Sequence, residues 1–249
     1  MRVVAARSQP EVFTAVGNVL EVEGLNVRLG ASDVIRDLSF FLPPGSSLAV
    51  LGPNGAGKTV LLRALIGALP SSGTIRWAPQ TRFGYVPQKL DIERNLPISG
   101  WDLLHAKAAL SAATDSDIGR ALADVALPEQ VLAQPVGTLA GGQFQRLLIA
   151  FALLGHPTVL LLDEPAAGID APGQTQLAEL VRRLQTAAGL AVVLVSHDLS
   201  VVYRYADRVL CIGRGHACFG PPDVALTPET LNAIYGTPVA FHRHDESLH

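Results

Sequence analysis

The chain has 249 residues and a formal net charge of −3, with 49% hydrophobic and 16% charged residues and a mean hydropathy of +0.31. This length suits one large domain, or one domain with an inserted lobe. The slightly negative charge argues against a nucleic-acid partner. The high hydropathy suits a parallel sheet buried on both faces, together with a surface that docks on another protein.

No segment has the length of a membrane span. The longest apolar run, residues 147–154, has eight residues, whereas a spanning helix needs about 20. The N-terminal residues lack the apolar core and small-residue cleavage site of a signal peptide. We therefore expect a cytoplasmic protein, and the two cysteines fit this expectation because a chain of this size needs no disulfide.

Short apolar runs and helical periodicity divide the chain into elements. Residues 89–157 are rich in Ala and Leu at helical spacing, which indicates a helical lobe. A hairpin is expected around Arg214 and Gly215. Strands are expected at or within 19–29, 33–42, 47–52, 73–77, 82–86, 158–165 and 190–198. Helices are expected from about Gly57 over 58–69 and at 172–188, where Pro172 suits the first helical position.

The stretch "GPNGAGKT" follows a predicted strand and opens a predicted helix, as a phosphate-binding loop must. Its glycines let backbone N–H groups turn toward phosphate oxygens, and the helix N-terminus favours negative charge there. Lys58 is expected to reach the β and γ phosphates, and Thr59 to ligate Mg²⁺. The predicted ATP contacts are Gly52, Pro53, Asn54, Gly55, Ala56, Gly57, Lys58, Thr59 and Val60.

Three further stretches place polar residues at or just after the ends of predicted strands. In "VLLLDEP", Asp163 would bind Mg²⁺ and Glu164 would polarise a water near the γ-phosphate. In "LVSHD", His197 would contact the γ-phosphate. In "GYVPQ", Gln88 would ligate Mg²⁺ or orient water, and would report the nucleotide state to the helical lobe. We therefore expect Glu164, His197 and Gln88 to be catalytic.

These stretches, with "LAGGQFQR" and "GID", resemble in order and spacing the ATPase subunits of ABC transporters over about residues 19–226. The resemblance implies an α/β P-loop fold with a mostly parallel core sheet, an antiparallel β subdomain and an inserted helical subdomain. The implied divisions are an extension at 1–18, one ATPase domain at 19–225 (core 19–88 and 158–225, helical subdomain 89–157) and a tail at 226–249.

The resemblance also explains a second glycine stretch. In this family two subunits pair head to tail, and ATP lies between the phosphate loop of one and the signature of the other. Ala140, Gly141, Gly142 and Gln143 would then approach the partner's γ-phosphate at a helix N-terminus, where backbone N–H groups are free. Asp170 resembles the aspartate that communicates across this interface. Arg146 is expected to stabilise the signature helix.

Two departures from the family pattern predict weaker ATP affinity or slower turnover. Ala140 stands where the family has serine, which removes a hydroxyl bond to phosphate of about 1.5–3 kcal/mol. Leu29 stands roughly where an aromatic residue stacks on adenine, a contact of about 1–3 kcal/mol. We still expect an active enzyme, because Lys58, Asp163, Glu164 and His197 are present.

Several local stretches resemble the zinc-importer branch of the family. They are "GYVPQKLDIERNLPISG", "DEPAAGIDAPGQ" and "SHDLSVVYRYADRVLCIGRGHACFGPP", with the tail "HRHDE". The resemblance implies zinc uptake, with manganese or iron import as the alternative. It also implies a membrane permease partner, a periplasmic or extracellular metal-binding protein and a place on the cytoplasmic face of the membrane.

Two metal-site hypotheses come from histidine and cysteine positions. His242, His244 and His249 in the tail would bind Zn²⁺ weakly, and Cys211, His216 and Cys218 would form a second site across a hairpin. The alternatives are a polar tail without a ligand and cysteines that act as small core residues.

Two other function classes remain open from the sequence. One is a non-transport ABC ATPase, although members that act in translation usually have two ATPase domains on one chain. The other is a module that holds ATP without turnover, which Ala140 and Leu29 favour and which Glu164 and His197 argue against.

Overall fold

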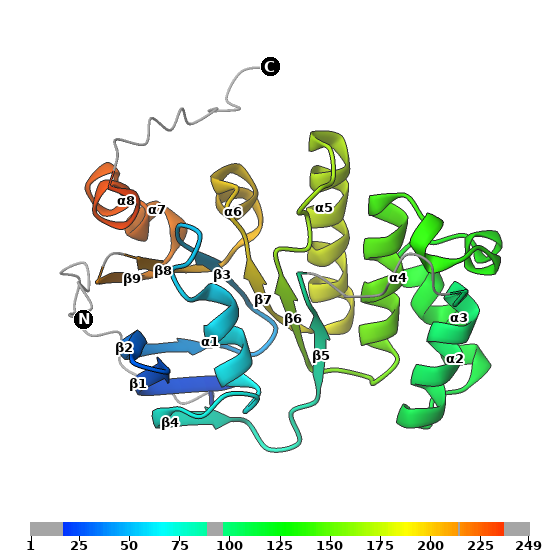
Figure 1. Ribbon diagram of the computed structural model, residues 1–249, viewed down its shortest axis with the longest axis horizontal. Coiled ribbons are helices and arrows are strands. Elements are labelled where there is room, and N and C mark those ends of the chain that lie inside the picture. The colour runs from blue at the N-terminus through cyan, green and yellow to red at the C-terminus, as the bar shows by residue number, and fades with distance from the viewer. Residues whose placement is uncertain (1–16, 89–96, 214, 237–249) are drawn as a thin grey trace.

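A computed structural model describes residues 17–88, 97–213 and 215–236 (Figure 1). The described strands form a six-stranded sheet in the order β5-β6-β7-β3-β8-β9 and a three-stranded sheet in the order β2-β1-β4. The strands are β1 (Leu20–Leu29), β2 (Ser32–Leu42), β3 (Ser47–Leu51), β4 (Ser72–Trp77), β5 (Phe83–Val86), β6 (Val159–Asp163), β7 (Ala191–Val195), β8 (Arg208–Gly213) and β9 (His216–Gly220). The α-helices are α1 (Lys58–Leu65), α2 (Gly100–Ser111), α3 (Asp115–Asp124), α4 (Gly141–Leu153), α5 (Ala171–Ala188), α6 (Leu199–Tyr205), α7 (Pro222–Ala225) and α8 (Pro228–Tyr235).

The larger sheet is parallel from β5 to β8, and β9 adds an antiparallel edge. Its central strands β3 and β6 are buried at every position, which explains their continuous apolar runs. Since parallel strands all end at the same edge, the segments that follow β5, β6, β7 and β3 meet there. This edge brings together residues from four distant parts of the sequence.

The smaller sheet is antiparallel, and α1 packs between it and the parallel sheet. Leu20 of β1, Leu61 of α1 and Leu161 of β6 belong to one hydrophobic cluster, and each is fully buried. Figure 1 shows this sheet at the lower left, below α1. The cluster holds the start of α1 against the end of β3.

A helical region occupies the opposite end of the molecule (Figure 1). It contains α2, α3, α4 and two short 3-10 turns, Glu129–Ala133 and Val136–Thr138. Its core joins that of the parallel sheet, since Ile118 and Leu147 share a cluster with Leu162 of β6. Capping boxes begin α2 at Ser99 and α3 at Thr114. The predicted fold, with parallel and antiparallel sheets and an inserted helical part, is confirmed.

Two helix boundaries differ from the sequence prediction. The first helix ends at Leu65 instead of residue 69, because Gly67 turns left-handed (φ 74°) and its N–H bonds Ala64. The helix expected from Pro172 begins at Ala171, because the Asp170 side chain accepts the Gly173 N–H and caps it.

The chain after β9 folds back onto the parallel sheet. Helices α7 and α8 pack on β8 and β9, with Leu231 and Ile234 of α8 buried. Of the helices that the structure describes, none combines the length and apolar character needed to cross a membrane.

Candidate nucleotide site

The predicted phosphate loop connects the end of β3 to the start of α1. Gly57 caps α1 with φ 98°, in the left-handed region that favours glycine, and a β-carbon there would lie 2.7 Å from the Val34 side chain. A β-carbon at Gly52 would collide with the carbonyl oxygen of Ile212. Of the other loop residues, Asn54 and Gly55 are exposed. Gly52 and Gly57 are therefore required by the fold, and they also suit a loop that binds phosphate.

Lys58 connects the loop to the end of β6. Its ammonium group is buried (6% exposed) and donates to the carbonyls of Gly52 and Pro53 at 2.9 and 3.3 Å. It also lies 3.4 Å from Glu164 Oε1, while Gln88 Nε2 donates to Glu164 Oε2 at 2.9 Å. Three residues that the sequence predicts to be functional thus form one continuous chain of polar contacts.

Strand register accounts for this convergence. Val86 pairs with Leu162, so Gln88 lies two residues beyond β5 next to the end of β6. Asp163 pairs with Val195, and Val195 pairs with Val50 of β3. His197 therefore follows the strand that lies between the two acidic residues and the phosphate loop. It is exposed and lines a small cavity together with Glu164.

Asp163 has the environment of a cation ligand. The residue is 2% exposed, and its Oδ2 atom is buried without a hydrogen-bond partner among the described residues. Burial raises the pKa of the Asp163 carboxyl; the hydrogen bond from Thr59 opposes this increase, and the charge of Glu164 adds to it. Hydroxyl and carboxylate oxygens are the ligands that Mg²⁺ prefers. The residues present therefore fit a magnesium ion.

Glu164 has a left-handed backbone with φ 47°, which is uncommon for a residue with a side chain. Its N–H bonds the Val195 carbonyl at 3.2 Å, and its side chain contacts Lys58 and Gln88. This conformation turns the carboxylate from the end of β6 toward the phosphate loop.

The second glycine stretch begins α4, in the helical region, as predicted. Gln143 accepts the Ala140 N–H at 3.2 Å, but Ala140 has no side-chain oxygen to accept an N–H of the first turn. Ala140 and Gly141 are exposed, and a β-carbon on Gly142 would meet no described atom within 4 Å. Arg146 donates to the Val125 carbonyl at 2.6 Å, which ties α4 to the end of α3.

A model of the ABC transporter family matches residues 35–167. The chain belongs to the ABC transporter family. It is 39% identical over 221 residues to the zinc import ATP-binding protein ZnuC of Jannaschia sp. (88% of this chain, 89% of that one). It is 41% identical over 232 residues to the protein of the same name from Ruegeria pomeroyi (91% and 89%). Together with the site, these matches identify an ATPase of this family, as the sequence predicts.

A solved structure supports the same assignment. It is an inward-facing ABC transporter described as of the metal-chelate type, with a TM-score of 0.81 and 28% identity. The match covers 89% of this chain and 90% of that one. The ABC fold, with its parallel sheet, antiparallel sheet and helical region, therefore extends over nearly all of the described residues.

The position expected to face adenine in an ABC ATPase lies at the end of the β1–β2 hairpin. Leu29 ends β1 and is 42% exposed. Val60, the last predicted ATP contact, lies in the first turn of α1 and is half-buried against the hydrophobic cluster there. An exposed leucine offers apolar contact to a base but no aromatic stacking.

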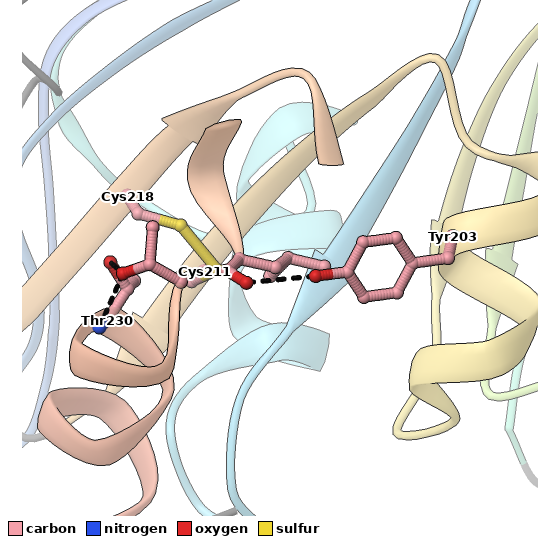
Figure 2. Close-up of a disulfide and its surroundings, with 6 residues drawn as sticks. Tyr203, Cys211, Cys218 and Thr230 are labelled. Carbon is pink, nitrogen blue, oxygen red and sulfur yellow. Dashed lines mark hydrogen bonds between the residues drawn. A yellow bond between two sulfur atoms is a disulfide. The ribbon is translucent and has the colours of Figure 1, made fainter. Parts of the chain in front are cut away.

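The hypothesis that Cys211, His216 and Cys218 form a metal site at the β8–β9 hairpin is wrong. Cys211 and Cys218 lie directly opposite each other, 4.8 Å apart at Cα, and are joined by a disulfide (Figure 2). This spacing suits a disulfide, and a disulfide-bonded sulfur is no thiolate ligand. Nor does any group of three or more His, Cys, Asp or Glu among the described residues suit a metal.

The alternative, that these cysteines act as small core residues, is confirmed by their burial, and the structure adds a disulfide between them that a chain of this size does not need. Both are buried, 1% and 5% exposed, in a cluster with α7 and α8. Figure 2 shows Tyr203 of α6 and Thr230 of α8 near the disulfide. The Tyr203 hydroxyl donates to the Leu226 carbonyl at 2.9 Å, so this cluster also secures the last described helices. His242, His244 and His249 lie outside the described residues.

Two side chains near Asp163, those of Tyr85 and Arg63, were not among the residues predicted from the sequence. Burial raises the pKa of the Tyr85 hydroxyl, and the charge of Asp163 adds to this increase, whereas Arg63 of α1 opposes it. Tyr85 belongs to "GYVPQ", where only the glutamine was considered. Its position in the strand beside β6 was the signal that could have identified it.

Proposed function

We propose that this chain is the ATP-hydrolysing subunit of an ABC importer for a divalent metal, with zinc as the substrate. The contacts from Lys58 to Glu164 and from Glu164 to Gln88 are the observation that supports hydrolysis, because they place an ammonium, a carboxylate and an amide at one phosphate loop. The names of the curated relatives support zinc.

In this proposal Gly52, Pro53, Asn54, Gly55, Ala56 and Gly57 cradle the phosphates, and Lys58 binds the β and γ phosphates. Thr59, Asp163 and Gln88 would hold Mg²⁺, which would supply positive charge to neutralise the phosphates. Glu164 polarises the attacking water. His197 contacts the γ-phosphate, and Val60 and Leu29 contact the rest of the nucleotide. A phosphate that enters the loop competes with Glu164 for Lys58, which frees the carboxylate for water.

We further propose that two copies of the chain form an ATP-sandwiched homodimer. The first turn of α4 supports this, because exposed Gly141 and open Gly142 leave backbone N–H groups available to an external phosphate. Ala140, Gln143 and Asp170 complete this interface. Each site is then built from the phosphate loop of one subunit and the signature of its partner.

The wider assembly follows from the importer assignment. A membrane permease holds the dimer at the cytoplasmic face of the membrane, and a periplasmic or extracellular protein delivers the metal. Gln88 contacts Glu164 and precedes the helical region in the chain, so it can report the nucleotide state to that region. No nucleic acid takes part.

Glu164→Gln tests the ATPase and the dimer together. The variant should keep nucleotide binding, lose hydrolysis and accumulate as an ATP-bound dimer, because the amide polarises water poorly. Size-exclusion chromatography at micromolar protein with ATP and Mg²⁺ measures this, with ADP as the control. A monomeric variant in ATP would contradict the sandwich.

The substrate is tested by growth of a strain that lacks the gene, in chelated medium with single metals restored and cell metal content measured. Rescue by zinc alone supports the proposal. Rescue by manganese or iron alone keeps the ATPase and changes the substrate. Absence of any metal phenotype, in a strain without a redundant importer, favours a non-transport ATPase.

A further inference from the structure

The segment from Glu164 to Asp170 connects the end of β6 to α5 through two consecutive turns. The Ala167 N–H bonds the Glu164 carbonyl at 3.0 Å, and the Ile169 N–H bonds the Ala166 carbonyl at 3.2 Å. The second turn begins at Ala166, inside the first turn. The position of Ile169 therefore constrains that of Glu164.

A side chain of α5 holds the far end of this segment. Gln174 Nε2 donates to the Ile169 carbonyl at 2.9 Å, and Gln174 is half-buried. The Asp170 side chain accepts the Gly173 N–H at 3.2 Å. The segment is thus attached to the first turn of α5 by one amide side chain and by the helix cap.

The Ile169 side chain lies between two glycines of different helices. A β-carbon on Gly173 of α5 would collide with its Cγ2 atom. On the other side, a β-carbon on Gly141 of α4 would lie 3.9 Å from its Cγ1 atom and 3.6 Å from the Gly168 carbonyl oxygen. The start of the signature helix therefore lies next to the same segment that begins at Glu164, with room for no more than one β-carbon in between.

Gln174 also lines a cavity with Glu164 and His197, beneath the predicted catalytic edge. The cavity measures about 30 Å³, which is room for water but not for a nucleotide base or a metal chelate. We therefore assign Gln174 no ligand.

We propose that Gln174 is a positioning residue. By holding the Ile169 carbonyl it fixes the Glu164–Asp170 segment between the signature helix and the catalytic carboxylate of the same subunit. This inference rests on the proposed ATPase function and deepens it. A change at the first turn of α4, where the partner's ATP would bind, is then transmitted through Ile169 to Glu164.

The test compares Gln174→Met with Gln176→Met in the full-length protein. Both variants remove an amide from α5 and keep the length of the side chain, but Gln176 is exposed. Loss of one neutral hydrogen bond should lower kcat about five- to tenfold. The KM for ATP should stay within about twofold, since the phosphate loop does not contact Gln174. Gln174→Glu, which lacks the donor, should behave like Gln174→Met.

Hydrogen exchange provides a measurement that does not depend on hydrolysis. The amides of Ala167 and Ile169 should exchange about fivefold faster in Gln174→Met than in Gln176→Met, at unchanged midpoint of thermal unfolding. If the parent hydrolyses ATP and both methionine variants match it in kcat and exchange, the inference is wrong and the proposed function stands. If the parent lacks ATPase activity but exchange changes as expected, Gln174 holds the Glu164–Asp170 segment as inferred and the proposed function fails. A variant that loses kcat only because it unfolds would also overturn the inference.

Discussion

Two glycine-rich stretches of this ABC ATPase have opposite surroundings. In the phosphate loop, Gly52 and Gly57 leave no room for a side chain, and Lys58 is buried and bonded to loop carbonyls. In the signature, Gly142 faces open space and Ala140 is exposed. The first stretch is complete within one chain. In the second, the Ala140 N–H bonds Gln143 of the same helix, whereas the space around Gly142 is open.

The difference in surroundings distinguishes two reasons why a position in the chain is occupied by glycine. The fold itself requires Gly52 and Gly57, because the Ile212 carbonyl and the Val34 side chain occupy the space of a side chain at these two positions. The fold does not require Gly142, since a β-carbon there would meet no described atom, and the proposed homodimer gives this glycine the role of letting the partner's phosphate approach the backbone. Substitutions in the two stretches should therefore have effects of different kinds.

The largest effect is expected from Lys58→Ala. Removal of the buried ammonium should lower kcat/KM for ATP at least about 100-fold, as loss of a preorganised donor does elsewhere. A coupled ATPase assay measures this, with Arg183→Ala as the control, because Arg183 is exposed on α5 and belongs to neither glycine-rich stretch. Equal losses in the two variants would contradict the assignment of Lys58.

Gly52→Ala and Gly142→Ala test the comparison directly. Gly52→Ala should lower the free energy of unfolding by about 3 kcal/mol, because its β-carbon collides with the backbone. Gly142→Ala should change it by no more than about 1 kcal/mol, in the stabilising direction, since alanine favours a helix. Urea unfolding without nucleotide gives both values. Gly142→Ala should nevertheless lower ATPase activity, and normal activity would argue against a partner phosphate at this site.

Ala140→Ser should improve the signature. The new hydroxyl can cap α4 and bond a partner's phosphate, so the ATP concentration for half-maximal dimerisation should fall roughly tenfold. Turnover should rise with it. Titration of the Glu164→Gln background by light scattering measures dimerisation. An unchanged midpoint would mean that the alanine is already compensated.

The smallest effect concerns pH. Because burial raises the pKa of Asp163 in the folded protein, the native state binds more protons than the unfolded state between the ordinary value of 3.8 and the raised value. The Asp163 contribution to stability therefore falls as pH rises through that window. Without metal or nucleotide, Asp163→Asn should be about 1 kcal/mol more stable than the parent at pH 7. This difference in the free energy of unfolding should decrease toward pH 4. A difference that does not change with pH would contradict burial of the charged carboxylate as its cause.

The motifs of this site are readable in the sequence because each occupies a few consecutive residues. The phosphate loop needs glycines and a lysine at set positions after a strand, and Asp163 and Glu164 directly follow an apolar strand. Their convergence is also predictable, since parallel strands end at one edge. The end of α1 at Leu65 and the start of α5 at Ala171 were less predictable. Each is set by a single residue, Gly67 for α1 and the capping Asp170 for α5.

Contacts between distant side chains were not predictable. Cys211 and Cys218 suggested metal ligands in the sequence, and only the register of β8 and β9 sets them opposite each other. In the sequence, Gln174 was only part of a stretch that resembles zinc importers. Its hydrogen bond to the Ile169 carbonyl depends on how α5 packs and could not be predicted.

The sequence by itself therefore determined which residues form the phosphate-loop motif and which strands are buried, because backbone conformation and apolar burial leave local patterns. The tertiary structure decided which of those residues meet. The Lys58–Glu164–Gln88 contacts and the Ile169 packing between Gly141 and Gly173 depend on strand order and helix placement, which no short stretch of sequence encodes.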